Sequence, residues 1–97
     1  MKKIIVQFNF PGTTTKQVDQ AWEASRAAGQ ANPKGLLHHV SGQQGNNLVV
    51  VDVWESAEAF SKYGETLMPI LAKAGFPNVP PTITPVHYEY TGTVAQR

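Results

Sequence analysis

The stretch LVVVDVWESAEAF, residues 48–60, decides the fold of this chain because it joins a strand directly to a helix. Its first part alternates and is rich in β-branched residues, which predicts a strand over residues 47–55. Ser56 then fits the N-cap of a helix, and Glu58 places a negative charge in the first turn, where the helix dipole favours it. Alternation along the strand predicts a common face for Val50, Asp52 and Trp54.

A second strand is expected just before this one, over residues 35–43, and the two strands should form a hairpin. Gly45 and Asn46 lie between them. They fit a two-residue loop of type II′, which takes Gly in its first position. The loop therefore predicts the register of the hairpin.

This register decides which histidine meets the carboxylate of the strand. The two-residue loop places Leu37 opposite Trp54 and His39 opposite Asp52. A slip by one residue would bring His38 opposite Asp52 instead, so both pairings stay open. In either case the neighbouring histidines point to opposite faces of the sheet.

The residues before the hairpin predict a strand over residues 2–10, which ends at a Pro-Gly pair, and then a helix. Thr14 fits an N-cap, and Gln17 follows three residues later, as a capping box requires. The helix should end before Pro33, since the residue preceding a proline disfavours helix. The face expected to be buried carries Val18, Ala21, Trp22 and Ser25.

The residues after the hairpin predict a second helix and a last strand. Pro69 lies inside this helix and should kink or split it, because proline removes a backbone donor. Gly75 fits the C-terminal cap. Residues 76–81 predict an extended connector, residues 83–91 a strand, and residues 93–97 a loose tail. The expected buried stripe of the helix is Ala57, Phe60, Gly64, Leu67, Leu71 and Ala74.

The resulting order, β-α-β-β-α-β over a single domain of residues 1–97, predicts a ferredoxin-like α+β fold. Four antiparallel strands should lie in the spatial order 4-1-3-2, with both helices on one face. A chain of 97 residues buries one small core, so an uncovered sheet face would gain from pairing with a second copy.

Composition excludes several kinds of function. The eight basic residues are scattered and the net charge is +1, so no nucleic-acid surface is indicated. The chain has no cysteine, and its apolar runs are too short for a signal peptide or a membrane span. These features favour a cytoplasmic protein without a membrane partner. The glycines are separated from one another, so no nucleotide, nicotinamide or flavin cofactor is implied.

A metal site is also not indicated. His39 and His87 lie on strands at opposite edges of the expected sheet, about 14 Å apart at three strand spacings. His38 and His39 point to opposite faces, so the three histidines of one chain are not expected to share an ion; a site across a dimer interface stays open. No cofactor is therefore expected.

His39 and Asp52 are the expected catalytic residues. A carboxylate facing a histidine holds the ring in one tautomer, which suits a general base. The alternative is a structural pair in which two buried polar groups satisfy each other. Both readings stay open on the sequence.

The motif V-x-V-W-E-S-x-E-A-F, residues 51–60, resembles the signature of the antibiotic-biosynthesis-monooxygenase-like family. The resemblance implies that two ferredoxin-like sheets pair face to face into a dimeric α/β barrel, so the partner is a second copy of the chain. It also implies a pocket between sheet and helices that binds a small apolar or aromatic ligand; a core role for Trp54 is the alternative. The expected pocket-lining residues are Trp54, Tyr63, Phe60 and Val50.

The sequence resembles two branches of this family only in part. The haem-degrading branch is similar in Asn9 and Trp54, but it requires a histidine on the second helix, which is absent here. The cofactor-independent, quinone-forming oxygenases are similar in Trp54. They carry an asparagine where this chain has Val50.

The sequence therefore leaves more than one function open. The first is a cofactor-independent monooxygenase-like enzyme that acts on a small aromatic or polyketide-like molecule. The second is a dimeric module, related to stress or to small-ligand binding, that has no catalytic activity. A third is a subunit that assembles with a different protein through its exposed sheet face.

Overall fold

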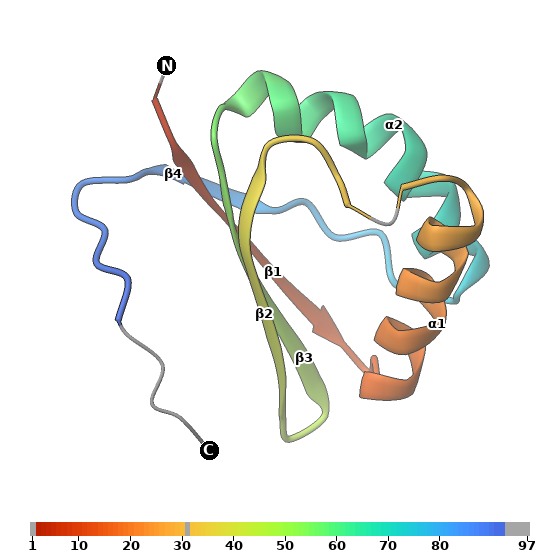
Figure 1. Cartoon of the computed structure of the whole chain (residues 1–97). Helices are drawn as coiled ribbons and strands as arrows, with labels where there is room; N and C mark the ends of the chain where they lie inside the picture. Colours follow the sequence, from red (N-terminus) through yellow and green to blue (C-terminus); the bar gives the residue numbers. More distant parts are fainter. Residues whose placement is uncertain (1, 31, 93–97) are drawn as a thin grey trace.

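The computed structural model describes residues 2–30 and 32–92 and contains one sheet and two helices (Figure 1). The four strands are antiparallel and lie in the order β2-β3-β1-β4. The predicted ferredoxin-like α+β fold and its strand order are therefore confirmed. The elements are β1 (Ile4–Pro11), α1 (Thr15–Ala27), β2 (Leu36–Gln44), β3 (Asn47–Trp54), α2 (Ala57–Lys73) and β4 (Thr82–Pro85).

Both helices lie on the same side of the sheet, as expected (Figure 1). The core forms between them and the two central strands, where every second residue of β1 and β3 is buried. In the described part of the chain, the opposite face of the sheet therefore carries no helix (Figure 1). The buried core residues from the two strands are Ile4, Val6, Phe8, Phe10, Leu48, Val50 and Trp54.

The hairpin of β2 and β3 closes through the predicted two-residue loop. Gln44 pairs with Asn47, and Gly45 has a φ of +59°. No residue other than glycine has a positive φ in the described part of the chain, so the φ of Asn46 is negative, as a type II′ turn requires. The pairing of His39 with Asp52 is confirmed.

The predicted pairing of Leu37 with Trp54 is wrong, because a bulge shifts the register at the start of β2. Leu36 lies opposite Trp54, and the register shift falls between Leu36 and His38. The cause is a close approach of the chain to α2. Gly35 has a φ of +91°, and a Cβ atom there would lie 2.6 Å from that of Ala59. Leu37 is left exposed as the extra residue.

Both helices begin and end with local signals that the sequence contains. Thr14 and Gln17 form the predicted capping box, and Ser56 caps α2. Gly75 follows α2 with a φ of +83°; its amide donates to the carbonyl of Ala72, and the amide of Phe76 donates to that of Leu71. These two bonds are those of a Schellman motif.

The second helix differs from its prediction in two ways. It is not split at Pro69, because Pro69 and Glu65 lie on the exposed side, where water can bind the carbonyl left without an amide. Ala57 is exposed rather than buried. The buried stripe is centred on Tyr63, and Ala59 takes the place expected for Ala57. Neither helix in the described residues combines the length and apolar character that crossing a bilayer requires.

The last strand is shorter than predicted, since β4 ends at Pro85 rather than near residue 91. Pro85 has no amide hydrogen, and its partner Ile4 is the first residue of β1. One further bond joins the amide of Val86 to the carbonyl of Lys3 at 3.0 Å. Beyond it the chain leaves the sheet edge, on the side away from the helices (Figure 1). The tail predicted over residues 93–97 lies outside the described residues.

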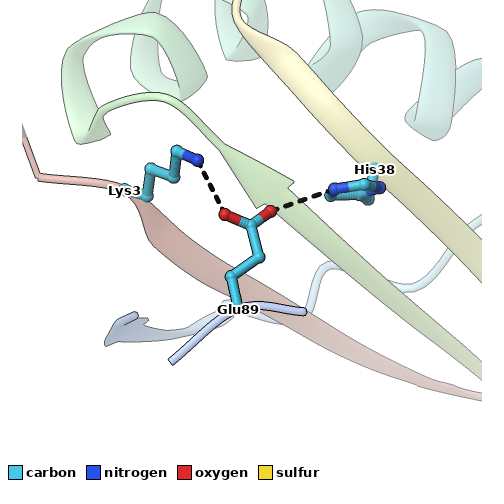
Figure 2. Close-up of polar contacts among 3 residues, drawn as sticks. All are labelled: Lys3, His38 and Glu89. Atoms are coloured by element: carbon cyan, nitrogen blue, oxygen red, sulfur yellow. Dashed lines mark hydrogen bonds and ion pairs between the residues drawn. The ribbon is translucent and has the colours of Figure 1, made fainter. Parts of the chain in front are cut away.

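An ionic bridge holds this terminal segment to the sheet. Lys3 Nζ donates to Glu89 Oε1 at 2.6 Å, and His38 Nε2 lies 3.0 Å from Glu89 Oε2 (Figure 2). The Lys3 ammonium, hydrogen-bonded to Glu89, lowers the pKa of the Glu89 carboxyl below its usual value, and His38 adds to this effect. One carboxylate therefore ties residues 86–92 to Lys3, which directly precedes β1, and to His38 on β2.

We expect this bridge to weaken as the pH falls. The pKa of Glu89 is lower in the folded than in the unfolded chain, so the ionised bridge stabilises the segment above the ordinary carboxyl pKa. This contribution is lost as the pH falls through the lowered value. Amide hydrogen exchange of residues 86–92, corrected for the intrinsic rate at each pH, should therefore accelerate in acid.

Glu89→Gln should accelerate the same exchange already at neutral pH. Glu65→Gln on the exposed side of α2 is the matched control and should leave the segment unchanged. Equal protection of residues 86–92 in both variants would contradict a role for the bridge.

Candidate functional site

A small cavity of about 60 Å³ lies between the sheet and the two helices. Its wall is almost wholly apolar and aromatic, and it includes Val50, Trp54 and Tyr63. Phe60, which was expected to line the same pocket, packs instead behind it, with its ring 5.6 Å from that of Trp54. The polar side chains at the wall are few, and His39 and Asp52 are two of them.

His39 and Asp52 form a direct pair across β2 and β3. His39 Nδ1 lies 2.5 Å from Asp52 Oδ1. The second carboxylate oxygen, Oδ2, accepts a hydrogen bond of 3.4 Å from Trp54 Nε1. Asp52 is only 8% exposed, so both oxygens have partners inside the protein. Each buried donor and acceptor of this pair is thus satisfied.

Trp22 on α1 completes this chain of hydrogen bonds, and its contact shows which tautomer His39 adopts. Trp22 Nε1 lies 3.2 Å from His39 Nε2 and donates to it. An indole nitrogen can only donate, so His39 Nε2 carries no hydrogen and acts as the acceptor. The ring hydrogen therefore sits on Nδ1 and is donated to Asp52. The sequence predicted Trp22 only as a buried-face residue, since nothing in its local pattern links it to a strand residue 17 positions away.

Tyr63 belongs to a separate chain of hydrogen bonds. Ser25 Oγ donates to the carbonyl of Gln30 at 3.1 Å, and it lies 2.9 Å from Tyr63 Oη. Because the single hydroxyl hydrogen of Ser25 is used on Gln30, Tyr63 is the donor to Ser25. Burial raises the pKa of Tyr63, Ser25 opposes the shift, and the charge of Asp52 adds to it. Tyr63 is thus a neutral wall residue whose hydroxyl hydrogen is already committed.

The other histidines contribute nothing to this site. His38 points to the opposite face, where it meets Glu89 (Figure 2). His87 lies beyond the end of β4. Within residues 2–30 and 32–92, no three His, Asp or Glu side chains come together as metal ligands. The polar groups of the cavity are therefore organised as a hydrogen-bond network.

Comparison with solved structures identifies the class of this fold. A candidate antibiotic biosynthesis monooxygenase from Caulobacter crescentus matches with a TM-score of 0.59 and 13% identity, over 92% of each chain. A similar candidate from Chloroflexus aurantiacus matches with a TM-score of 0.57 and 15% identity, over 92% of this chain and 97% of the other. The chain therefore has the ferredoxin-like fold of the antibiotic-biosynthesis-monooxygenase-like proteins.

One solved neighbour contains a bound ligand. It is a monooxygenase from Streptomyces coelicolor in complex with nanaomycin D, with a TM-score of 0.54 and 15% identity, over 97% of this chain and 93% of that one. No protein-family model matches the sequence, and no curated protein does so either. At these identities the likeness concerns the fold, and the chemistry depends on the side chains at the site.

We expect Asp52→Asn to destabilise the protein by about 1–3 kcal/mol, the cost of leaving a buried donor unpaired. Asp52 accepts from two donors, but an asparagine offers one oxygen and one NH₂ group. The NH₂ group would face either His39 Nδ1–H or Trp54 Nε1–H. Urea unfolding measures the difference.

Asp19→Asn on the exposed side of α1 is the matched control, and it should change the stability by less than about 0.5 kcal/mol. If Asp52→Asn were as stable as this control, the carboxylate would not be the required acceptor of the network.

Proposed function

We propose that the chain is a cofactor-independent monooxygenase-like enzyme that acts on a small aromatic or polyketide-like molecule. The observation that carries this proposal is the His39–Asp52 pair at the wall of an apolar, aromatic cavity. The unprotonated Nε2 of His39 is the basic atom, and Asp52 stabilises the imidazolium that forms when Nε2 takes a proton. Trp54 and Tyr63 are the aromatic walls.

The polar groups of the cavity favour a neutral ligand that can lose a proton. Both oxygens of Asp52 and the hydroxyl hydrogen of Tyr63 are already used, and among residues 2–30 and 32–92 no lysine or arginine lines the cavity. An anionic ligand would therefore find neither a cation nor an unused donor. A phenol brings its own donor and matches His39 Nε2.

Oxidation of such a phenol to a quinone requires dioxygen as its only co-reactant. His39 accepts the proton of the phenol, and the electron-rich ring carbon then attacks oxygen. A ring C–H becomes C=O, one oxygen atom enters the product as a quinone oxygen, and the other leaves as water. The substrate supplies all the electrons, so no separate reductant is required.

An aromatic ligand requires more room than the resting cavity provides. A cavity of about 150 Å³ binds benzene, whereas this one measures about 60 Å³. A surface groove of about 370 Å³ adjoins it, and the two share the side chains of Phe8, Phe10, Leu71 and Phe76. Joined, they reach the range of small-molecule pockets, so Leu71 and Phe76 are the side chains that a ligand would displace. The complex of the Streptomyces coelicolor monooxygenase with nanaomycin D supports the proposal that a protein of this fold binds a small organic molecule.

A second candidate function is a ligand-binding module without catalysis. The saturated hydrogen bonds of His39 and the small volume of the cavity favour it. Such a module would bind an aromatic ligand without consuming oxygen. Oxygen uptake in the presence of an aromatic ligand therefore separates the two functions.

Oxygen uptake with 1-naphthol tests the enzyme, and 1-methoxynaphthalene is the control ligand because it has no proton to lose. We expect uptake with the naphthol alone. His39→Asn keeps a donor for Asp52 but removes the base, so turnover should fall by about 10²–10⁴-fold. His38→Asn, on the opposite face, is the matched control and should keep its activity. A His39→Asn protein that melts clearly lower yet turns over normally would remove the catalytic role.

We also propose that two copies pair through the sheet face opposite the helices, beside residues 86–92, which Glu89 ties to the same face. Ile5, Val51 and Val53 share this face with Val40, which is 63% exposed. Light scattering should give twice the chain mass of 10.6 kDa, because burial of this face stabilises a dimer. Val40→Asp should shift the mass toward one chain.

Met68→Asp, at an exposed position on α2, is the control for added charge and should leave the mass at two chains. A monomeric wild-type protein would contradict the homodimer and favour assembly with a different protein.

A further inference from the structure

The contact between Trp22 and His39 joins α1 to β2 at the cavity wall. The indole ring stands almost perpendicular to the imidazole, at 77°, with ring centroids 5.0 Å apart. Its N–H points at His39 Nε2, 3.2 Å away. The side chain of His39 is 24% exposed, so this contact lies near the rim of the cavity.

This contact occupies the one atom that the proposed reaction requires to be free. His39 Nδ1 is held by Asp52, so a proton can be accepted only at Nε2. Trp22 Nε1–H already fills that lone pair. The indole keeps its hydrogen, so the contact occupies the lone pair of His39 Nε2 without protonating it.

Protonation of His39 and the Trp22 contact exclude each other. Once Nε2 carries a hydrogen, it faces the indole N–H, and two donors cannot bond to one another. Trp22 must then turn aside. The position of one side chain on α1 is thus coupled to the protonation state of His39 on β2.

We propose that Trp22 is a positioning residue for His39, a role that rests on His39 being the base of the proposed function. In the resting protein, Trp22 holds the imidazole ring against Asp52 and keeps water from Nε2. A ligand hydroxyl replaces the indole N–H at the same lone pair, one donor for another. A ligand that can donate a hydrogen bond therefore takes the place of the indole at His39 Nε2, whereas a ligand that cannot donate leaves the Trp22 contact intact.

Nitrogen NMR of the histidine rings in the resting protein tests this proposal without any ligand. The wild-type His39 should show a protonated Nδ1 and an unprotonated Nε2. Trp22→Phe keeps an aromatic ring but removes the donor. The tautomer should stay the same because Asp52 still accepts from Nδ1, while the Nε2 resonance moves toward that of a free lone pair.

A second measurement follows the indole itself. His39→Ala removes the acceptor, so the Trp22 indole hydrogen should exchange with solvent roughly fivefold faster, as the loss of one hydrogen bond implies. Glu23→Gln, an exposed position on the same helix, is the matched control and should change neither the exchange nor the His39 spectrum. A protonated Nε2 in the wild-type protein, or an unchanged Nε2 resonance in Trp22→Phe, overturns the proposal.

The result of the Trp22 test can be distinguished from the result of the test of the proposed enzyme. If no aromatic compound drives oxygen uptake while the NMR shifts are as expected, the enzyme is rejected and the positioning contact remains. If His39 proves catalytic but Trp22→Phe changes neither turnover nor the Nε2 resonance, the base remains and Trp22 is only a packing residue.

Discussion

A carboxylate buried in an apolar core is the constraint on which this structure depends. Asp52 lies on the inward face of β3, between Val50 and Trp54. Removing an unpaired charge from water costs several kcal/mol, so Asp52 must be given donors. His39 and Trp54 supply them, and Trp22 satisfies the remaining nitrogen of His39. The hairpin register places His39 opposite Asp52 on this inward face, so the strand pairing itself supplies one of the donors.

The parts of the fold that could be predicted from sequence are those that short-range signals determine. The Gly45 turn defined the pairing of His39 with Asp52, and the caps at Thr14 and Ser56 defined where both helices start. The error at Leu37 has a different origin. The bulge beside it follows from the approach of Gly35 to α2, and no local pattern around residue 35 shows that contact.

Two further features depend on neighbours that the sequence does not place. Residues 83–91 alternate as a strand should, but a strand requires a partner, and β1 begins at Ile4. The Glu89 carboxylate therefore pairs with Lys3 and His38 across the face of the sheet, and not with a neighbouring strand at its edge. Trp22 was identified as buried by its helical spacing, yet its bond to His39 depends on how α1 crosses the sheet. Periodicity predicts which face of an element is buried and leaves its partner undetermined.

The free-energy cost of burying this hydrogen-bond network bears on the function of the site. Replacing a buried polar pair by apolar residues of similar volume is often neutral or stabilising, so the pair is not needed to hold the core together. The surrounding wall, which includes Val50 and Tyr63, shows that this chain can pack an apolar interior at the same depth. In the proposed function, the carboxylate and imidazole in this wall serve to hold a basic nitrogen in place. The Trp22 N–H occupies that nitrogen in the structure, and its replacement by a ligand donor, as we propose, would suit a site that acts only when it is occupied.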